Sequence, residues 1–271
     1  MRKIFLLTLI LLCVTCAGCF QGNTNLIITD DGKVFLRNKF IGVPLVAEQI
    51  ESFKNNFAQN PNAEISPVVE NNMSGYEIRV NYPSVESFAS EKFSLFAAHK
   101  DKCAGIQQRT GWFFDAYKFD LLSTGEQALS PGEAAAVQSV LSQVSFDLTI
   151  ELPHAAENHN ADSFDAAQKN LTWNLAASLL SGKDKHMRAE FKLWHRGRIF
   201  LTALVEILLL AAGIFFHVKR KSAASDGIAA SLTSKRNIFA GLFVALLAIS
   251  AYMIFSPVTF KPADTISVTM P

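Results

Sequence analysis

The sequence predicts an α+β domain, built as a curved antiparallel sheet with packed helices and followed by a two-helix transmembrane hairpin. Three observations lead to this prediction. Apolar and polar residues alternate with the period of a strand in several short segments. Between these segments lie others in which apolar residues recur at helical spacing. Two long apolar segments lie near the C-terminal end. Basic and acidic residues are nearly balanced, at 25 and 24, so the composition implies neither nucleic acid nor an acidic surface as a partner.

Residues 1–18 have the layout of an export signal. Two basic residues precede an apolar block, Ile4–Val14, which is too short to span a bilayer comfortably. Small residues then stand directly before Cys19, which resembles the lipobox of bacterial lipoproteins, although Cys16 occupies the usual leucine position. The resemblance implies that Cys19 is acylated and becomes the mature N-terminus. An uncleaved anchor or an ordinary secretory signal is the alternative.

A signal cleaved before Cys19 removes two of the four cysteines. Acylation of Cys19 then leaves Cys103 as the only free thiol, so an internal disulfide cannot form. In an oxidising compartment a lone cysteine is more often buried than paired with another molecule, and its role here stays open.

Residues 19–198 are long enough for one exported domain with its own core. Leu26–Thr29 and Val34–Leu36 flank the sequence Asp-Asp-Gly-Lys, which predicts a hairpin. After Pro44, apolar residues recur at helical spacing and predict a helix with one buried face. The residues of that face are Val46, Ile50, Phe53 and Phe57. The other elements expected in this half are strands at Glu64–Glu70 and Gly75–Tyr82 and a short helix after Ser84.

Further along, Trp112–Leu122 is rich in aromatic residues and predicts a strand. Ser130 and Glu133 form a capping box around Pro131, so a helix begins there and continues to Gln143. The next nine residues, Val144–Leu152, alternate strictly and predict a half-buried strand.

The segment His154–Lys169 is polar and predicts a long loop. Leu171–Ala177 and His186–Leu193 alternate in the same way and are predicted to form the two strands of one hairpin. Trp173 is in phase with its apolar neighbours, which favours a core position over contact with a sugar or a lipid chain.

The order of these features resembles LppM-type bacterial lipoproteins. The resemblance covers Cys19 to Phe216. It includes the lipobox-like start, the strand with Asp-Gly and the capped helix before a strand. It also includes the sequence Asn170-Leu171-Thr172-Trp173-Asn174-Leu175, which precedes another strand and a transmembrane helix. It implies an exported domain similar to lipid-binding α+β folds, with a role at the cell envelope involving lipids or glycolipids. The chain departs from that family by its second transmembrane helix and its charged loop.

Residues 199–218 and 238–256 are apolar over nearly the length that a bilayer core requires and predict two transmembrane helices. The loop between them, residues 219–237, is basic at both ends and should stay in the cytoplasm. The domain before the helices and the tail after them, residues 257–271, are then on the outside.

Trp194, Arg196 and Arg198 stand directly before the first predicted transmembrane helix. The two arginines weaken the charge bias, because they lie on the side that should be poor in basic residues. We expect the three side chains to lie at the membrane interface, where the indole of Trp194 positions the helix.

Glu206 is an ionisable residue inside the first transmembrane segment, where such groups are costly and usually partnered. In an antiparallel hairpin, the position of similar depth on the second helix is near Ser250. We predict that Glu206, in its protonated form, is hydrogen-bonded to Ser250 or a neighbour and holds the helices together. The alternative is a functional role as a proton site or as a contact for a partner helix.

Candidate chemistry is sparse. His154, His159 and Asp162 could present nitrogen and oxygen ligands to zinc, but their spacing fits no familiar site, and an exposed loop is the simpler interpretation. The sequence contains no Gly-x-Ser-x-Gly elbow, Ser-x-x-Lys pair or phosphate-binding glycine loop. We therefore expect no catalytic residue, no cofactor and no metal.

The leading hypothesis is a non-enzymatic lipoprotein of the bacterial cell membrane. Its main domain would be periplasmic or extracellular and would bind lipid, glycolipid or another envelope partner. The alternative is a structural or assembly subunit that docks against another membrane protein, and a metal-dependent envelope hydrolase is the remote alternative. Periodicity identifies faces rather than pockets, so the ligand and the oligomeric state stay open.

Overall fold

The structure is a computed structural model of the chain and describes residues 20–58, 60–89, 105–123, 144–176, 178, 185–222, 225–260 and 265–266. It divides into two compact units. The first lies within Met1–Gln108, Tyr117–Leu193 and Phe260–Pro271, and the second comprises Arg109–Ala116 and Trp194–Thr259. The predicted signal, Cys19, Cys103 and the helix predicted at residues 130–143 lie outside the described residues.

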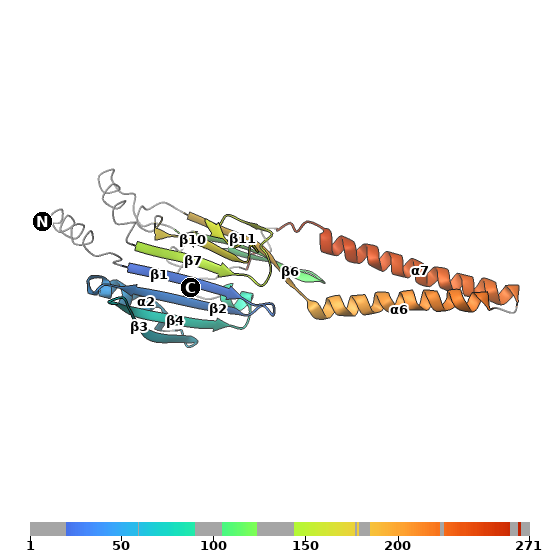
Figure 1. Cartoon of the computed structure of the whole chain (residues 1–271), viewed down its shortest axis with the longest axis horizontal. Coiled ribbons are helices and arrows are strands. Elements are labelled where there is room, and N and C mark those ends of the chain that lie inside the picture. The colour runs from blue at the N-terminus through green and yellow to red at the C-terminus, as the bar shows by residue number, and fades with distance from the viewer. Residues whose placement is uncertain are drawn as a thin grey trace. The chain divides into compact units, whose positions relative to one another are not determined.

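Seven strands form the larger sheet, in the order β3-β4-β2-β1-β7-β10-β9 (Figure 1). Their bounds are β1 Phe20–Ile28, β2 Val34–Gly42, β3 Ala63–Glu70, β4 Met73–Tyr82, β7 Val144–Glu151, β9 Ser163–Phe164 and β10 Asn170–Asn174. β1 pairs antiparallel with β2 and parallel with β7. Gly32 in the β1–β2 turn has a φ of 81°, a backbone conformation that favours glycine, which accounts for the predicted hairpin.

A second sheet has five strands in the order β12-β5-β6-β11-β8. Their bounds are β5 Gly105–Thr110, β6 Phe114–Ser123, β8 Asn158–His159, β11 Lys185–Trp194 and β12 Thr265–Ile266. The predicted α+β class is confirmed. The strands nevertheless form two sheets rather than one, and the larger sheet is mixed because β1 and β7 run parallel.

The predicted hairpin of Leu171–Ala177 with His186–Leu193 is wrong. β10 pairs with β7 and β9 in the larger sheet, whereas β11 lies between β6 and β8 in the smaller one. The two strands share an alternating pattern because each turns one face to the same core, where Trp173 and Phe191 are both buried. Alternation therefore predicts the buried face of each strand, but not its neighbour.

The predicted loop His154–Lys169 contains the short strands β8 and β9. It is bound to both sheets, because the Asp162 amide donates to the Thr172 carbonyl at 3.0 Å and the Asn160 amide donates to the Arg188 carbonyl at 3.2 Å. This segment is therefore held against both sheets, and its residue Ala156 is buried in the core.

The core lies between the two sheets and under the helix α2 (Ala47–Ala58), which follows a 3-10 turn at Pro44–Val46. Ile50 and Phe57 of α2 are buried, as their helical spacing predicts, and α3 (Val85–Ala89) adds Phe88. Trp173 is 0% exposed, which confirms its predicted core position. Its indole nitrogen donates to Asn160 Oδ1 at 3.0 Å, so the buried polar atom is satisfied.

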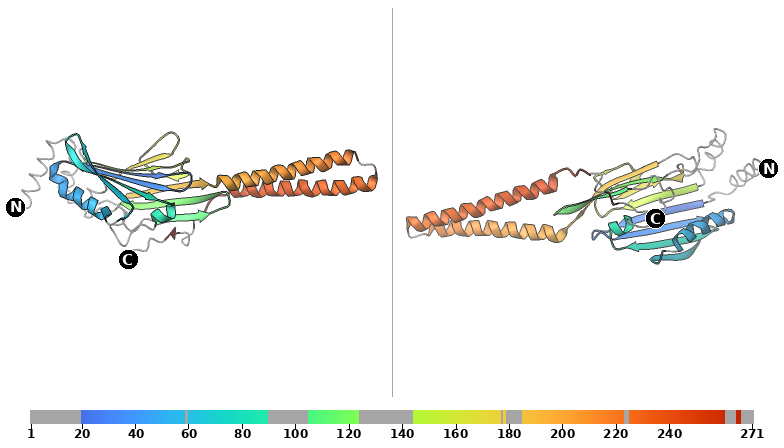
Figure 2. Two further views of the ribbon diagram at one scale, coloured as in Figure 1. Left: turned by 90° about the horizontal axis from the view of Figure 1, so that it is seen from below. Right: turned by 180° about the vertical axis from the view of Figure 1, so that it is seen from behind.

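The second unit contains two long helices, α6 (Arg196–Lys221) and α7 (Asp226–Phe255), which are long and apolar enough to cross a membrane. They run side by side as a hairpin, which confirms the predicted arrangement (Figure 2). Phe216 and Phe239 stack between them with ring centroids 5.4 Å apart. α7 begins at Asp226, so most of the basic stretch expected as a loop at residues 219–237 is helical.

Candidate functional site

The two faces of the larger sheet differ sharply in polarity. Along β1, Thr24, Leu26 and Ile28 are buried on the face toward the core, and Gln21, Asn23 and Asn25 alternate with them on the opposite face. The outward positions of the neighbouring strands continue this polar surface, with Arg37 and Lys39 on β2, Glu77 and Arg79 on β4, and Ser145, Asp147 and Thr149 on β7.

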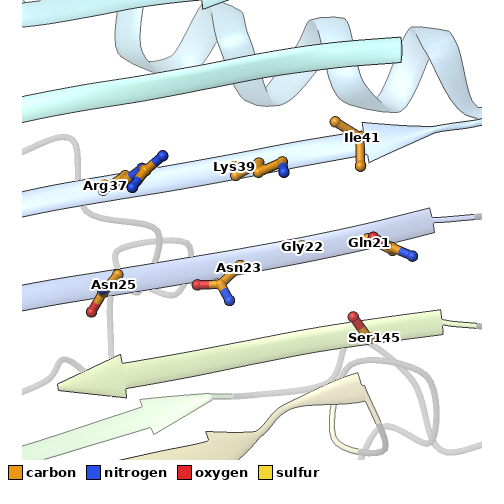
Figure 3. Close-up of a pocket in the computed structure, with 8 residues that line it drawn as sticks. All are labelled: Gln21, Gly22, Asn23, Asn25, Arg37, Lys39, Ile41 and Ser145. Carbon is orange, nitrogen blue, oxygen red and sulfur yellow. The ribbon is translucent and has the colours of Figure 1, made fainter. Parts of the chain in front are cut away.

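A groove with a volume of about 300 Å³ lies on this polar face. Its lining comes from three adjacent strands: Gln21, Gly22, Asn23 and Asn25 from β1, Arg37, Lys39 and Ile41 from β2, and Ser145 from β7 (Figure 3). The volume is at the lower end of that found for ligand sites, and most lining side chains are polar. The groove is therefore suited to the polar part of a ligand rather than to an acyl chain.

Gly22 lines the groove, and on the core side of the sheet its strand neighbours leave no room for a side chain at this position. It is opposite Phe40 on β2 and Phe146 on β7. A Cβ atom at position 22 would stand 2.2 Å from Phe146 Cδ2. The rings of Phe40 and Phe146 stack with centroids 6.1 Å apart, and this aromatic pair supports the sheet beneath the groove.

Arg37 at the edge of the groove is paired with Glu77. Its guanidinium donates to Glu77 Oε2 at 2.7 Å, and Arg79 binds the other oxygen of the same carboxylate. The Glu77 side chain is only 7% exposed, so this carboxylate is held between two more exposed cations. The hydrogen bond from Arg37 lowers the pKa of Glu77 against the effect of burial, and the same bond raises the pKa of Arg37.

The other charged and amide groups are also paired across strands. Lys39 binds Glu70 at 2.6 Å, and Asn25 Nδ2 donates to Glu151 Oε1 at 2.9 Å. The Asn25 Oδ1 atom is buried and accepts no hydrogen bond from the described residues. The groove thus combines cations that are already paired with carboxylates and amide donors and acceptors, a set that can bind several hydroxyl groups at once.

The predicted intramembrane pair is brought together: the Ser250 hydroxyl donates to Glu206 Oε1 at 3.1 Å. Ser250 is a buried polar residue in a helix whose other side chains are mostly exposed. The hydrogen bond joins α6 to α7.

The predicted interface residues lie at the start of α6. Trp194 ends β11, and its ring meets Phe114 edge-on at a centroid distance of 5.1 Å. Arg196 is the first residue of α6. The Arg198 guanidinium lies 5.5 Å from the ring centroid of Trp112, a contact that depends on the β5–β6 turn and that the sequence pattern does not predict.

The weak zinc candidates do not converge. No group of three metal-ligating side chains occurs among the residues that the structure describes. His154 Nε2 pairs with Asp30 at 3.0 Å, the His159 ring packs edge-on against Phe164, and Asp162 pairs with Lys185. Each candidate has a separate structural partner instead.

The comparisons with known proteins give one finding. A search of solved structures finds the NMR structure of the folded domain of Mycobacterium tuberculosis LppM, with a TM-score of 0.38 and 13% sequence identity. The alignment covers 67% of this chain and 94% of that domain. No protein-family model matches the sequence, and no curated protein matches it.

Proposed function

We propose that the chain is a membrane-anchored, non-enzymatic protein of the bacterial envelope, whose exported domain binds the hydroxyl-rich headgroup of a glycolipid in the groove on its larger sheet. The groove between β1, β2 and β7 carries this proposal. On this proposal α6 and α7 span the membrane, the basic turn between them faces the cytoplasm, and Cys19 is lipidated.

The balance of charges in the groove favours a sugar over a strongly anionic ligand. Arg37 and Lys39 each have a carboxylate partner, Glu77 and Glu70, although Arg37 shares Glu77 with Arg79. Only part of the positive charge beside the groove is therefore left for a ligand. Amide groups such as that of Asn23, together with the Ser145 hydroxyl, can both donate and accept hydrogen bonds to ligand hydroxyls. The small volume fits a headgroup rather than an acyl chain.

The test uses the full chain, purified in mild detergent from the membranes of a bacterial host. Organic extracts of the purified protein are analysed by mass spectrometry. We expect a retained glycolipid, and about a tenfold weaker retention in the variant Asn23→Ala/Ser145→Ala, since a neutral hydrogen bond contributes roughly 0.5–1.5 kcal/mol.

Asn81→Ala is the matched control, because Asn81 is an exposed asparagine on the same face of the sheet that does not line the groove. It should retain glycolipid as the wild type does. Equal retention by the groove variant and the wild type, or no glycolipid in any preparation, would contradict the proposal.

The second candidate is an assembly subunit, and the outward faces of the two long helices favour it. Large apolar side chains on α6 and α7, including Phe200 and Phe255, are exposed within the chain. Lipid can cover them, but so can the helices of another membrane protein. A protein that co-purifies at fixed stoichiometry in mild detergent, without retained glycolipid, would favour this second function.

A further inference from the structure

We propose a second lipid site, for the phosphate of an anionic phospholipid, at a collar formed by Arg109, Trp112 and Arg198. It rests on the proposed membrane-spanning role of α6 and α7, but not on the groove. All three residues belong to the second unit.

The turn is bound to the first turns of α6. The backbone amide of His195 donates to the Phe113 carbonyl at 2.8 Å, and Arg198 Nη1 donates to the Gly111 carbonyl at 3.2 Å. The indole nitrogen of Trp112 donates to Thr202 Oγ1, also at 3.2 Å. These bonds hold Trp112 beside α6 at the level of Thr202.

The same turn is also bound to the chain that follows α7. Arg109 Nη1 donates to the Thr259 carbonyl at 3.2 Å, and Thr259 lies four residues after the last residue of α7, Phe255. Arg109 and Arg198 are thus fixed on the two sides of one turn, next to the ends of both long helices. We infer that a lipid headgroup at this level contacts both guanidinium groups, because the same turn holds both.

Neither arginine of the collar has an acidic partner among the residues that the structure describes. The oxygens that Arg109 and Arg198 bind belong to backbone carbonyls and to Thr259, and no carboxylate among the described residues lies within salt-bridge distance of either one. The acid that follows the turn, Asp115 on β6, is 3.2 Å from His195 Nε2 instead. By contrast, the arginines Arg37, Arg79 and Arg188 on the sheets all have acidic partners.

The surroundings favour a phospholipid over a free phosphate ion. Trp112 is 46% exposed, its indole is bonded to α6, and a half-exposed indole is the side chain typical of the bilayer interface. Exposed apolar residues follow at once along α6, including Phe200 and Leu204. Acyl chains can run along them while the phosphate pairs with the guanidinium groups, which bind phosphate oxygens in a bidentate way.

The experiment reconstitutes the full chain in vesicles of equal parts phosphatidylglycerol and phosphatidylcholine. The protein is re-extracted in mild detergent, and the bound lipids are quantified by mass spectrometry. We expect enrichment of phosphatidylglycerol, and a loss of about fivefold for each of Arg109→Gln and Arg198→Gln, as for a basic residue near a membrane surface. Inorganic phosphate in excess should leave the enrichment unchanged.

Two variants serve as controls. Arg188→Gln removes the same charge from a residue paired with Asp120, and Asn23→Ala/Ser145→Ala alters the groove. Both should keep the enrichment. Equal binding of the two lipids, unchanged enrichment in both collar variants, or displacement by inorganic phosphate would overturn the proposal.

The depth of the collar is tested separately with brominated acyl chains, which quench nearby indoles. The difference in quenching between the wild type and Trp112→Phe reports on Trp112 alone. We expect quenching of Trp112 by bromines placed close to the headgroup. If these bromines do not quench Trp112, the placement of the collar at the interface is wrong. Glycolipid retention in the groove could still hold in that case. The failure of this proposal can therefore be distinguished from the failure of the groove proposal.

Discussion

Phe40 and Phe146 stack across a strand that contributes no side chain between them. Their ring centroids are 6.1 Å apart, and Gly22 of β1 is the register partner of both residues. The glycine is needed here for space and not for its backbone conformation, because a Cβ would meet the Phe146 ring. One small residue therefore connects the packing of the core to the floor of the groove.

We expect Gly22→Ala to destabilise the chain by about 1–3 kcal/mol, the usual cost of overpacking. The added methyl group would displace the Phe146 ring. The measurement is thermal unfolding of the full chain in detergent, followed by tryptophan fluorescence, to which the buried Trp173 contributes. The double variant Gly22→Ala/Phe146→Leu should recover part of the loss, and an unchanged melting temperature in Gly22→Ala would contradict the packing argument.

Glu77→Gln should lower stability by about 1 kcal/mol at neutral pH, because it removes a charged acceptor from two arginines that are themselves more than half exposed. The pKa of Glu77 is lowered in the folded chain, so its stabilising effect is complete above the ordinary value of 4.5 and is lost as pH falls through the lowered value. The difference between wild type and variant should therefore shrink in acid. Glu64→Gln, at an exposed position of β3, should show no comparable difference.

Thr24→Val should stabilise the chain by about 1 kcal/mol. Thr24 is 1% exposed, and its hydroxyl has no hydrogen-bond partner among the described residues; the amide atoms of Asn38, its register partner, have none either. Valine has the same shape without the buried polar atom. Thr149→Val is the control, because the Thr149 hydroxyl shares a hydrogen bond with Thr172 at 3.2 Å, and its loss should not stabilise. A destabilised Thr24→Val would mean that the hydroxyl is satisfied in solution.

Cysteines placed at positions 206 and 250 should crosslink in membranes, because Glu206 and Ser250 face each other across the hairpin. The starting chain carries Cys103→Ser to remove a competing thiol. The control pair Glu206→Cys/Tyr252→Cys should not crosslink, since Tyr252 is exposed on another side of α7. Crosslinking of the control pair alone would show that the helices pack in a different register.

The sequence predicts those features of the fold that depend on local patterns. The Asp-Gly turn, the buried face of α2 and the core position of Trp173 each follow from spacing along one segment. The Glu206 pair was also predictable, because an antiparallel helix hairpin places each residue of one helix at the level of a known residue of the other.

Strand neighbours and the groove depend on long-range pairing and were not predictable in this way. The first half of β1 escapes prediction because Gly22 and Thr24 occupy its inward positions, so its alternation is not visible as apolar and polar. The outward positions of that half are occupied by Gln21, Asn23 and Asn25, which line the groove. A search for alternating amides next to the predicted hairpin could have identified them.

The parallel pairing of β1 with β7 has a consequence for folding kinetics. The second strand that pairs with β1 is β7, which follows it by more than a hundred residues in the chain. This pairing raises the contact order of the larger sheet. The N-terminal hairpin can form early, but one edge of β1 has no neighbour until Val144–Glu151 is available. On the proposed export route, β7 can pair with β1 only after most of the domain has crossed the membrane. Until then the edge of β1 is unpaired, and premature aggregation would begin there.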